Sequence, residues 1–328
     1  MDSESNSTGR ELSLSKKILQ KSIKSRVDEL IKNGNSKAPW VVELDPTTAC
    51  NLACHDCISA NLLNKGGFKK DRIKELAKEF KEAGVRAVVL IGGGEPMAHP
   101  EFGNLVDYFT KNNIHVGVTS NGTLIRRYLK PLSKAKWVRI SMDAGTSEIY
   151  KIYRPHRSGI SQFDTVIEQM KELQKIKTGK LGYSFLILSM KDKDGKNITN
   201  AIDIENAANV AKEIGCDYFE VKPAFEITHF LQSHEKEVNE IVNKQLKKIR
   251  SLETENFKII SPFTLEDSLK GNVIQEKKYK KCYSAELRTV ISPSGSYVCP
   301  YHRGNENLKI GDNNTQSLKE MWSSDQRK

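Results

Sequence analysis

The 328-residue sequence has no apolar run that approaches the roughly 20 residues needed to cross a bilayer. Its N-terminal stretch, MDSESNSTGRELSLSKK, also lacks the apolar segment of a secretory signal. We therefore expect a cytoplasmic protein with no membrane partner. No fixed-period repeat is present, which excludes a solenoid. The contents of 38% hydrophobic and 28% charged residues are typical of a globular chain with one large domain or two modest ones.

The sequence also lacks any recognisable nucleic-acid-binding module, although its formal net charge is +11. The excess of lysine and arginine is distributed over segments of helical character, such as 69–81 and 244–250, where it forms solvated helix faces. We therefore expect no nucleic-acid partner. The positive charge leaves an anionic substrate open.

Cysteine is scarce, with six residues in the chain, yet three of them fall within eight positions. Cys50, Cys54 and Cys57 have the spacing C-x3-C-x2-C. In a cytosolic chain such crowding indicates metal ligation or redox chemistry rather than structural disulfides. Three thiolates suit an iron–sulfur cluster with one open iron, or a zinc ion if His55 supplies a fourth ligand.

Short apolar runs alternate with amphipathic segments from residue 40 onward. The runs predict buried strands at 41–44, 87–91, 115–119, 137–142, 183–188 and 218–221. Apolar residues at helical spacing predict helices around 73–80, 163–170 and 204–211. Six strands that alternate with helices favour an α/β fold, namely a partial (β/α)6 barrel of the TIM type.

Three regions follow from this pattern. Residues 1–39 form a polar tail and a helix expected from about 15 to 32. Residues 40–225 form the barrel, and residues 226–328 form a small α+β extension.

Within the extension, apolar spacing predicts a helix at 238–249. The segment Ser292-Pro293-Ser294-Gly295 predicts a hairpin turn between strands at 288–291 and 296–298.

The cysteine motif, followed by Gly92-Gly93-Gly94-Glu95-Pro96 after the second strand, resembles the radical S-adenosylmethionine (SAM) superfamily over about residues 40–225. The resemblance implies a [4Fe–4S] cluster on Cys50, Cys54 and Cys57, whose open iron chelates SAM. It further implies reductive cleavage of SAM to a 5′-deoxyadenosyl radical that abstracts a hydrogen atom from the substrate. An electron donor such as flavodoxin or ferredoxin is implied as well. Asp56 departs from the family pattern, which commonly has an aromatic residue there, so adenine stacking is not expected at that position.

The resemblance also assigns SAM contacts to residues that follow the predicted strands. Gly93 and Gly94 permit a close backbone approach, and Glu95 is expected to bind the SAM ammonium group. An arginine fork suits a carboxylate, so Arg154 is expected to bind the SAM carboxylate. The other implied contacts are Ser120, Asn121, Ser141 and Asp143 for the ribose and methionine moiety, and Lys222 near the adenine or the substrate. The carboxyl ends of successive strands are where α/β barrels build active sites.

The C-terminal residues resemble the SPASM or twitch extensions of the same superfamily, which carry auxiliary iron–sulfur clusters. The resemblance rests on Cys282, Gly295, Cys299 and the segment Tyr301-His302-Arg303-Gly304. A full SPASM extension needs many more cysteines. We therefore expect at most one auxiliary cluster, on Cys282, Cys299 and His302, the alternative being an extension that keeps the fold without the metal.

The short extension favours a radical SAM enzyme that acts on a small polar substrate such as a sugar, an aminocyclitol or a nucleotide-linked sugar. Epimerisation, dehydrogenation and dehydration all begin with abstraction of a hydrogen atom. An epimerase needs a hydrogen donor, for which Cys216 is the candidate, although a small buried hydrophobe is its simpler interpretation. The alternatives are a peptide-modifying maturase and, more remotely, a zinc-stabilised binding module without catalysis.

Overall fold

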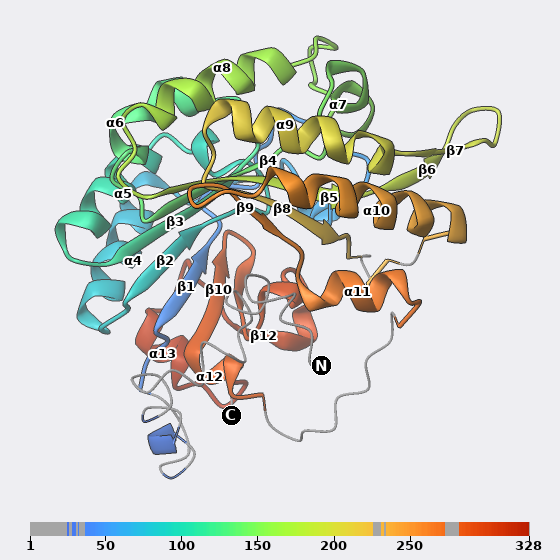
Figure 1. Ribbon diagram of the computed structural model, residues 1–328. Helices are drawn as coiled ribbons and strands as arrows, with labels where there is room; N and C mark the ends of the chain where they lie inside the picture. The colour runs from blue at the N-terminus through green and yellow to red at the C-terminus, as the bar shows by residue number, and fades with distance from the viewer. Residues whose placement is uncertain are drawn as a thin grey trace.

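The computed structural model describes residues 25, 28–30, 32, 37–225, 231–232, 234–272 and 282–327 (Figure 1). Residues 25, 28–30 and 32 are helical, and the rest of the helix predicted from about 15 to 32 lies outside the described residues. Within the described ranges, no helix combines the length and the apolar character that a membrane crossing requires.

The centre of the molecule is one ten-stranded sheet (Figure 1). Six of its strands lie where the sequence predicts them: β1 (Val41–Leu44), β2 (Ala87–Leu90), β3 (His115–Ser120), β4 (Trp137–Ser141), β5 (Lys180–Ile187) and β8 (Tyr218–Pro223). Four come later in the chain: β9 (Lys258–Ile260), β10 (Arg288–Ser292), β11 (Gly295–Tyr297) and β12 (Lys309–Gly311). The order is β12-β11-β10-β1-β2-β3-β4-β5-β8-β9, in which all neighbours from β10 to β9 are parallel. The predicted partial barrel is therefore confirmed.

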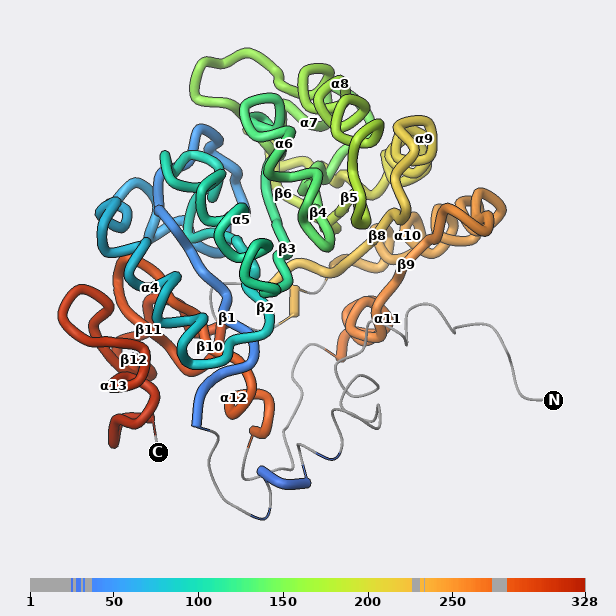
Figure 2. The backbone as a smooth tube through the Cα atoms, turned by 90° about the vertical axis from the view of Figure 1, so that its left-hand side faces the viewer, coloured from blue at the N-terminus to red at the C-terminus, as the bar shows by residue number. Residues whose placement is uncertain are grey.

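Amphipathic helices connect the parallel strands and pack against the sheet (Figures 1 and 2). The long ones are α4 (Lys70–Glu82), α5 (Phe102–Lys111), α8 (Phe163–Gln174), α9 (Ile204–Ile214) and α10 (Lys236–Ile249), and the short ones are α6 (Leu129–Leu132), α7 (Ser147–Tyr153) and α11 (Phe263–Leu269). In α9 the buried side chains recur at helical spacing, and Gly215 ends the helix in the left-handed conformation with φ of 84°. Each helix returns the chain to the amino ends of the strands, so the carboxyl ends of all the parallel strands lie on the same side of the barrel.

Residues after 225 build both edges of the sheet. Strand β9 pairs with β8, whereas β10 pairs with β1, so the C-terminal residues lie beside the first strand of the barrel (Figure 2). Strands β10 and β11 form the predicted hairpin, with Ser292 paired to Gly295, and this prediction is confirmed. The domain boundary expected between 225 and 226 stays a prediction.

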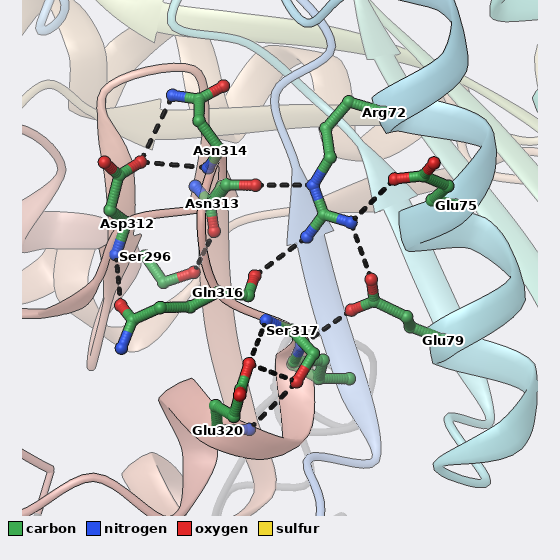
Figure 3. A network of polar contacts seen from close by, with 11 residues as sticks. Arg72, Glu75, Glu79, Ser296, Asp312, Asn313, Asn314, Gln316, Ser317 and Glu320 are labelled. Atoms are coloured by element: carbon green, nitrogen blue, oxygen red, sulfur yellow. Dashed lines mark hydrogen bonds and ion pairs between the residues drawn. The ribbon is translucent and has the colours of Figure 1, made fainter.

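One arginine joins this C-terminal region to the barrel (Figure 3). From α4, Arg72 donates hydrogen bonds to the backbone carbonyls of Asn313 (2.6 Å) and Gln316 (2.8 Å). It also pairs with Glu79 at 2.6 Å, and Glu79 accepts the backbone N–H of Leu318 at 2.6 Å. Leu318 begins α13 (Leu318–Trp322), so a short helix of the extension is held against a long helix of the barrel.

Candidate active site

A cavity of about 360 Å³ lies at the carboxyl ends of the parallel strands. It is lined by all twelve residues that the family resemblance assigns to the cluster and to SAM: Cys50, Cys54, Cys57, Gly93, Gly94, Glu95, Ser120, Asn121, Ser141, Asp143, Arg154 and Lys222. They come from segments up to 172 positions apart, from 50 to 222. Its volume lies within the range for ligand sites, roughly 300–1,000 Å³.

The cysteine loop follows β1 and is held in place by residues from two other loops. Leu52 forms an isolated bridge with His156, and the backbone N–H of Ala53 donates to the carbonyl of Pro155 at 2.8 Å. On the other side, Asn51 donates to the hydroxyl of Thr123 at 2.8 Å. These contacts fix the loop without using the cysteine side chains, which stay available as ligands.

The three cysteines fit an iron–sulfur cluster better than a single metal ion. Cys50, Cys54 and Cys57 are partly exposed and line the same cavity. Within the part of the chain that the structure describes, no three His, Cys, Asp or Glu side chains are close enough to hold one ion. Cluster thiolates bind separate irons at the corners of a cube, so they lie further apart than the ligands of one ion. His55, the fourth ligand of the zinc alternative, is 56% exposed beside Asp56 and does not line the cavity.

The cavity raises the pKa of the free thiols. Burial raises the pKa of Cys54 to about 11, and the nearby Arg154 guanidinium opposes this shift. Burial also raises the pKa values of Cys50 and Cys57. Because iron is bound by thiolates, assembly of a cluster here must release protons.

Glu95 lies at the centre of a hydrogen-bonded network between two strand ends. Its buried carboxylate accepts the Ser120 hydroxyl at 2.9 Å and the backbone N–H groups of Met97 (3.0 Å) and Asn121 (2.8 Å). Burial raises the pKa of Glu95 to about 7, and these three donors oppose the shift. A carboxylate has about four acceptor positions, so three donors leave one for an ammonium group. In this structure the Ser120 side chain is therefore directed at Glu95.

Gly94 occupies a position that no larger residue fits. A Cβ atom built there would lie 2.4 Å from the backbone carbon of Thr48 and 2.5 Å from the carbonyl oxygen of Ala49. The next residue, Glu95, donates its backbone N–H to that same Ala49 carbonyl at 2.8 Å. The glycine is needed because the loop after β2 packs directly on the backbone that leads to Cys50.

Asp143 and Arg154 form a buried ion pair beside the cysteines. Arg154 donates to Asp143 Oδ2 from Nε at 2.8 Å and from Nη2 at 2.5 Å, while Asp143 Oδ1 accepts the N–H of Leu186 at 2.8 Å. Asp143 has φ of 53°, a left-handed conformation that aspartate tolerates better than most residues. One edge of the Arg154 guanidinium is thus occupied, and its Nη1 atom lies 3.9 Å from the sulfur of Cys54.

Lys222 belongs to a charge cluster whose other members the sequence analysis missed. Its ammonium lies 3.3 Å from Glu220, which also accepts from Arg139 at 3.2 Å. Burial lowers the pKa of Lys222, and Glu220 opposes the shift. Glu220 and Lys222 stand two positions apart on β8, where alternate side chains share a face. Two charged residues at alternate positions of an otherwise apolar strand were the sequence feature that could have predicted this charge cluster.

Four predicted site residues lie away from this cavity. Cys216 is buried in the hydrophobic core before the amino end of β8, and burial raises its thiol pKa strongly. This placement is at the opposite end of the strand from the cavity, so the structure does not support Cys216 as a hydrogen donor. Cys282, Cys299 and His302 lie in the extension and belong to no three-ligand group among the described residues. An auxiliary cluster there stays a prediction.

Comparison with known proteins places this geometry in context. Residues 44–194 match the family described as the Radical SAM superfamily. The mycofactocin maturase MftC of Mycobacterium tuberculosis H37Rv is 32% identical over 140 residues, which are 42% of this chain and 34% of that protein. AlbA of Bacillus subtilis, an antilisterial bacteriocin subtilosin biosynthesis protein, is 26% identical over 164 residues, 48% of this chain and 36% of that protein. The chain spans about a third of the length of these relatives.

The overall fold is also similar to solved structures. The crystal structure of Streptococcus suis SuiB bound to its precursor peptide SuiA superposes with a TM-score of 0.67 at 19% identity. The match covers 96% of this chain and 71% of SuiB, so it includes residues on both sides of the barrel region.

Proposed function

We propose that this chain is a radical SAM enzyme that starts its reaction by abstracting a hydrogen atom from a peptide substrate. The match of residues 44–194 to the Radical SAM superfamily supports this proposal. The observation that supports this substrate class is the similarity to MftC, a maturase, and to AlbA, which acts in bacteriocin biosynthesis. A bacteriocin is a peptide product. These relatives favour the peptide alternative over the small polar substrate that the short extension led us to expect.

The residues of the cavity fit the two cofactors that this family implies. Cys50, Cys54 and Cys57 would hold a [4Fe–4S] cluster, and the Glu95 carboxylate would offer its remaining acceptor position to the SAM ammonium group. Arg154 lines the same cavity, and its Nη1 atom lies 3.9 Å from Cys54 Sγ. When bound, the cluster and SAM together supply hydrogen-atom abstraction. The protein orients SAM through these polar groups, and external reductants of the flavodoxin or ferredoxin type are the proposed electron donors.

The apolar residues that line the cavity support a substrate with an apolar side chain. Ile58, Leu63, Leu186, Leu188 and Phe225 line the cavity together with the polar residues already described. Apolar walls exclude water and shield a reactive species from side reactions.

One observation keeps a small polar substrate as a second candidate. Lys222 and Ser184 also line the cavity and add an ammonium group and a hydroxyl group to it. These two groups suit an anionic or hydroxylated metabolite. The two candidates therefore differ in whether the apolar or the polar lining residues make the specific contacts with the substrate.

The first test counts iron and sulfide after anaerobic reconstitution of the wild type and of the Cys50→Ala/Cys54→Ala/Cys57→Ala variant. We expect the wild type to contain a cluster and to cleave SAM under reducing conditions. Iron that persists in the triple variant supports the auxiliary cluster proposed on Cys282 and Cys299. A wild type without iron contradicts the proposed function.

The second test separates the two substrate classes. The reconstituted wild type is incubated with SAM, reductant and either a pool of synthetic peptides, with SuiA included, or a pool of sugars and aminocyclitols. We expect SAM cleavage to be faster with the peptide pool. We also expect deuterium from a labelled peptide to appear in 5′-deoxyadenosine, since the hydrogen atom that the radical takes from the substrate is transferred to that product. Modification in the metabolite pool alone establishes the second candidate instead.

A further inference from the structure

An arginine of the C-terminal extension reaches the loop that is proposed to bind SAM. Arg303 follows the short 3-10 helix η6 (Pro300–His302), and only 10% of its side chain is exposed. Its Nε atom donates to Asp45 Oδ2 and its Nη2 atom donates to Asp45 Oδ1 at 3.2 Å. Its Nη1 atom donates to the carbonyl of Pro300 at 3.2 Å. The guanidinium is therefore fixed both to its own loop and, in a two-pronged manner, to a carboxylate 258 residues earlier.

Asp45 is a fully buried carboxylate that needs this partner. It directly follows β1, and its backbone N–H donates to Ile291 of β10 at 2.8 Å. Burial raises the pKa of Asp45 to about 6, and the charge and hydrogen bonds of Arg303 are the main effects that oppose this shift. A buried charge without a partner is strongly destabilising. Glu43 lies on the same face of β1 and is paired with Arg288, with Arg303 at 3.8 Å.

The Asp45 carboxylate also touches the glycine loop. A Cβ atom at Gly93 would lie 3.5 Å from Asp45 Oδ2 and 3.9 Å from Arg303 Cδ, so both side chains lie beside the backbone of Gly93. The following residues, Gly94 and Glu95, are those that line the cavity next to the cysteines. A continuous chain of contacts thus runs from the extension through Asp45 to the SAM loop.

The other buried arginine of the extension with a carboxylate partner is Arg327, which pairs with Glu286 at 2.6 Å and lies over the Trp322 ring. It has no contact with the loop after β2 among those that the structure shows.

We propose that Arg303 is a positioning residue for SAM: it holds Asp45 in the orientation that fixes Gly93, and so gives the loop 92–95 the shape that binds the methionine end of SAM. The extension is then part of the SAM site rather than an independent appendage. This inference rests on the SAM site proposed above, but it does not depend on whether the substrate is a peptide.

The test is a double-mutant cycle on SAM affinity, measured by calorimetry on the reconstituted full-length protein without substrate. Arg303→Ala is expected to weaken SAM binding about tenfold, within the range usual for coupled sites, while iron content stays that of the wild type. Arg303→Lys is expected to recover part of the loss, since it restores the charge but not the fork. In an Asp45→Asn background the same Arg303→Ala change is expected to have little effect, because the buried charge is gone.

Arg327→Ala is the matched control, as it removes a buried arginine from the same extension. We expect its SAM affinity to be within about twofold of the wild type, because distant sites behave independently. The proposal is overturned if Arg303→Ala binds SAM like the wild type, if Arg327→Ala causes the same loss, or if the losses from Arg303→Ala and Asp45→Asn simply add. If Arg303→Ala does not fold, the cycle is run with Arg303→Lys. Protein that holds iron but binds no SAM even as wild type refutes the SAM site itself, which is a separate outcome.

Discussion

The Asp143→Asn substitution tests how much the buried ion pair with Arg154 contributes to the stability of the protein. Asp143 and Arg154 are 3% and 10% exposed, and two hydrogen bonds join them. Asparagine keeps an oxygen for the N–H of Leu186 and tolerates the left-handed backbone of this position. The substitution therefore removes mainly the negative charge and leaves the buried arginine without a counter-charge.

Breaking a buried pair by removing one partner typically costs 3–5 kcal/mol. Because asparagine preserves the backbone contact, we expect the lower end, about 3 kcal/mol of unfolding free energy. The measurement is urea unfolding of the cluster-free protein under reducing conditions, monitored by circular dichroism. The matched control is Asp107→Asn, whose pair with Lys134 has a similar distance of 2.7 Å but is 48% exposed on the acid side. An exposed pair contributes roughly 0–1 kcal/mol, so this control is expected to change little.

A double variant separates the cost of an unpaired buried charge from the loss of the pair itself. In Asp143→Asn/Arg154→Gln both charges are gone, and we expect it to be more stable than Asp143→Asn alone. Equal losses in Asp143→Asn and Asp107→Asn would refute the reasoning, since burial would then not decide the strength of the pair. A double variant that loses the sum of both single changes would refute it as well.

Two further predictions concern Glu95 and Arg72. Burial raises the pKa of Glu95 to about 7 from an ordinary 4.5, so the folded cluster-free protein keeps a proton that the unfolded chain releases. The stability of the wild type should therefore fall as the pH rises from about 4.5 to 7. The Glu95→Gln variant should lack this part of the pH dependence. The prediction is wrong if the urea midpoints of the wild type and of Glu95→Gln change with pH in parallel. Arg72→Ala should lower the unfolding free energy by about 2 kcal/mol and speed proteolysis near residue 313, because several charge-assisted hydrogen bonds are lost. The exposed Arg126→Ala serves as its control, and equal effects in the two variants contradict the role of Arg72 as an anchor.

The comparisons and the geometry divide the question of function into two levels. The family and its cofactor chemistry are supported by the match of residues 44–194 and by the cavity that gathers the twelve predicted residues. The identity of the substrate depends on the apolar and polar residues that line the same cavity. A common fold hosts many reactions, and the site decides among them, so the substrate class requires the experiments above.

The sequence by itself determined the elements of the barrel and the chemistry of its main motif. The six strands and the helices α4, α8, α9 and α10 were predictable because their apolar residues recur with the period of a strand or a helix. Cys50, Cys54 and Cys57 were recognisable because a compact cluster needs its ligands close together on one loop. Local periodicity and local spacing are properties of contiguous residues, so they can be inferred without the tertiary structure.

Only the tertiary structure decided which distant residues meet. Strand β10 pairs with β1 across 247 positions, which brings Arg303 to Asp45 and thereby the extension to the glycine loop. The same holds for Glu220 and Arg139, whose pairing inside the barrel gave Lys222 its partner. Cys216 illustrates the reverse case, since it precedes the strand predicted at 218–221, and sequence order alone therefore put it at the amino end of that strand and away from the carboxyl ends that build the site. Such contacts depend on strand order and register, and these are set by the packing of the whole sheet rather than by any short segment.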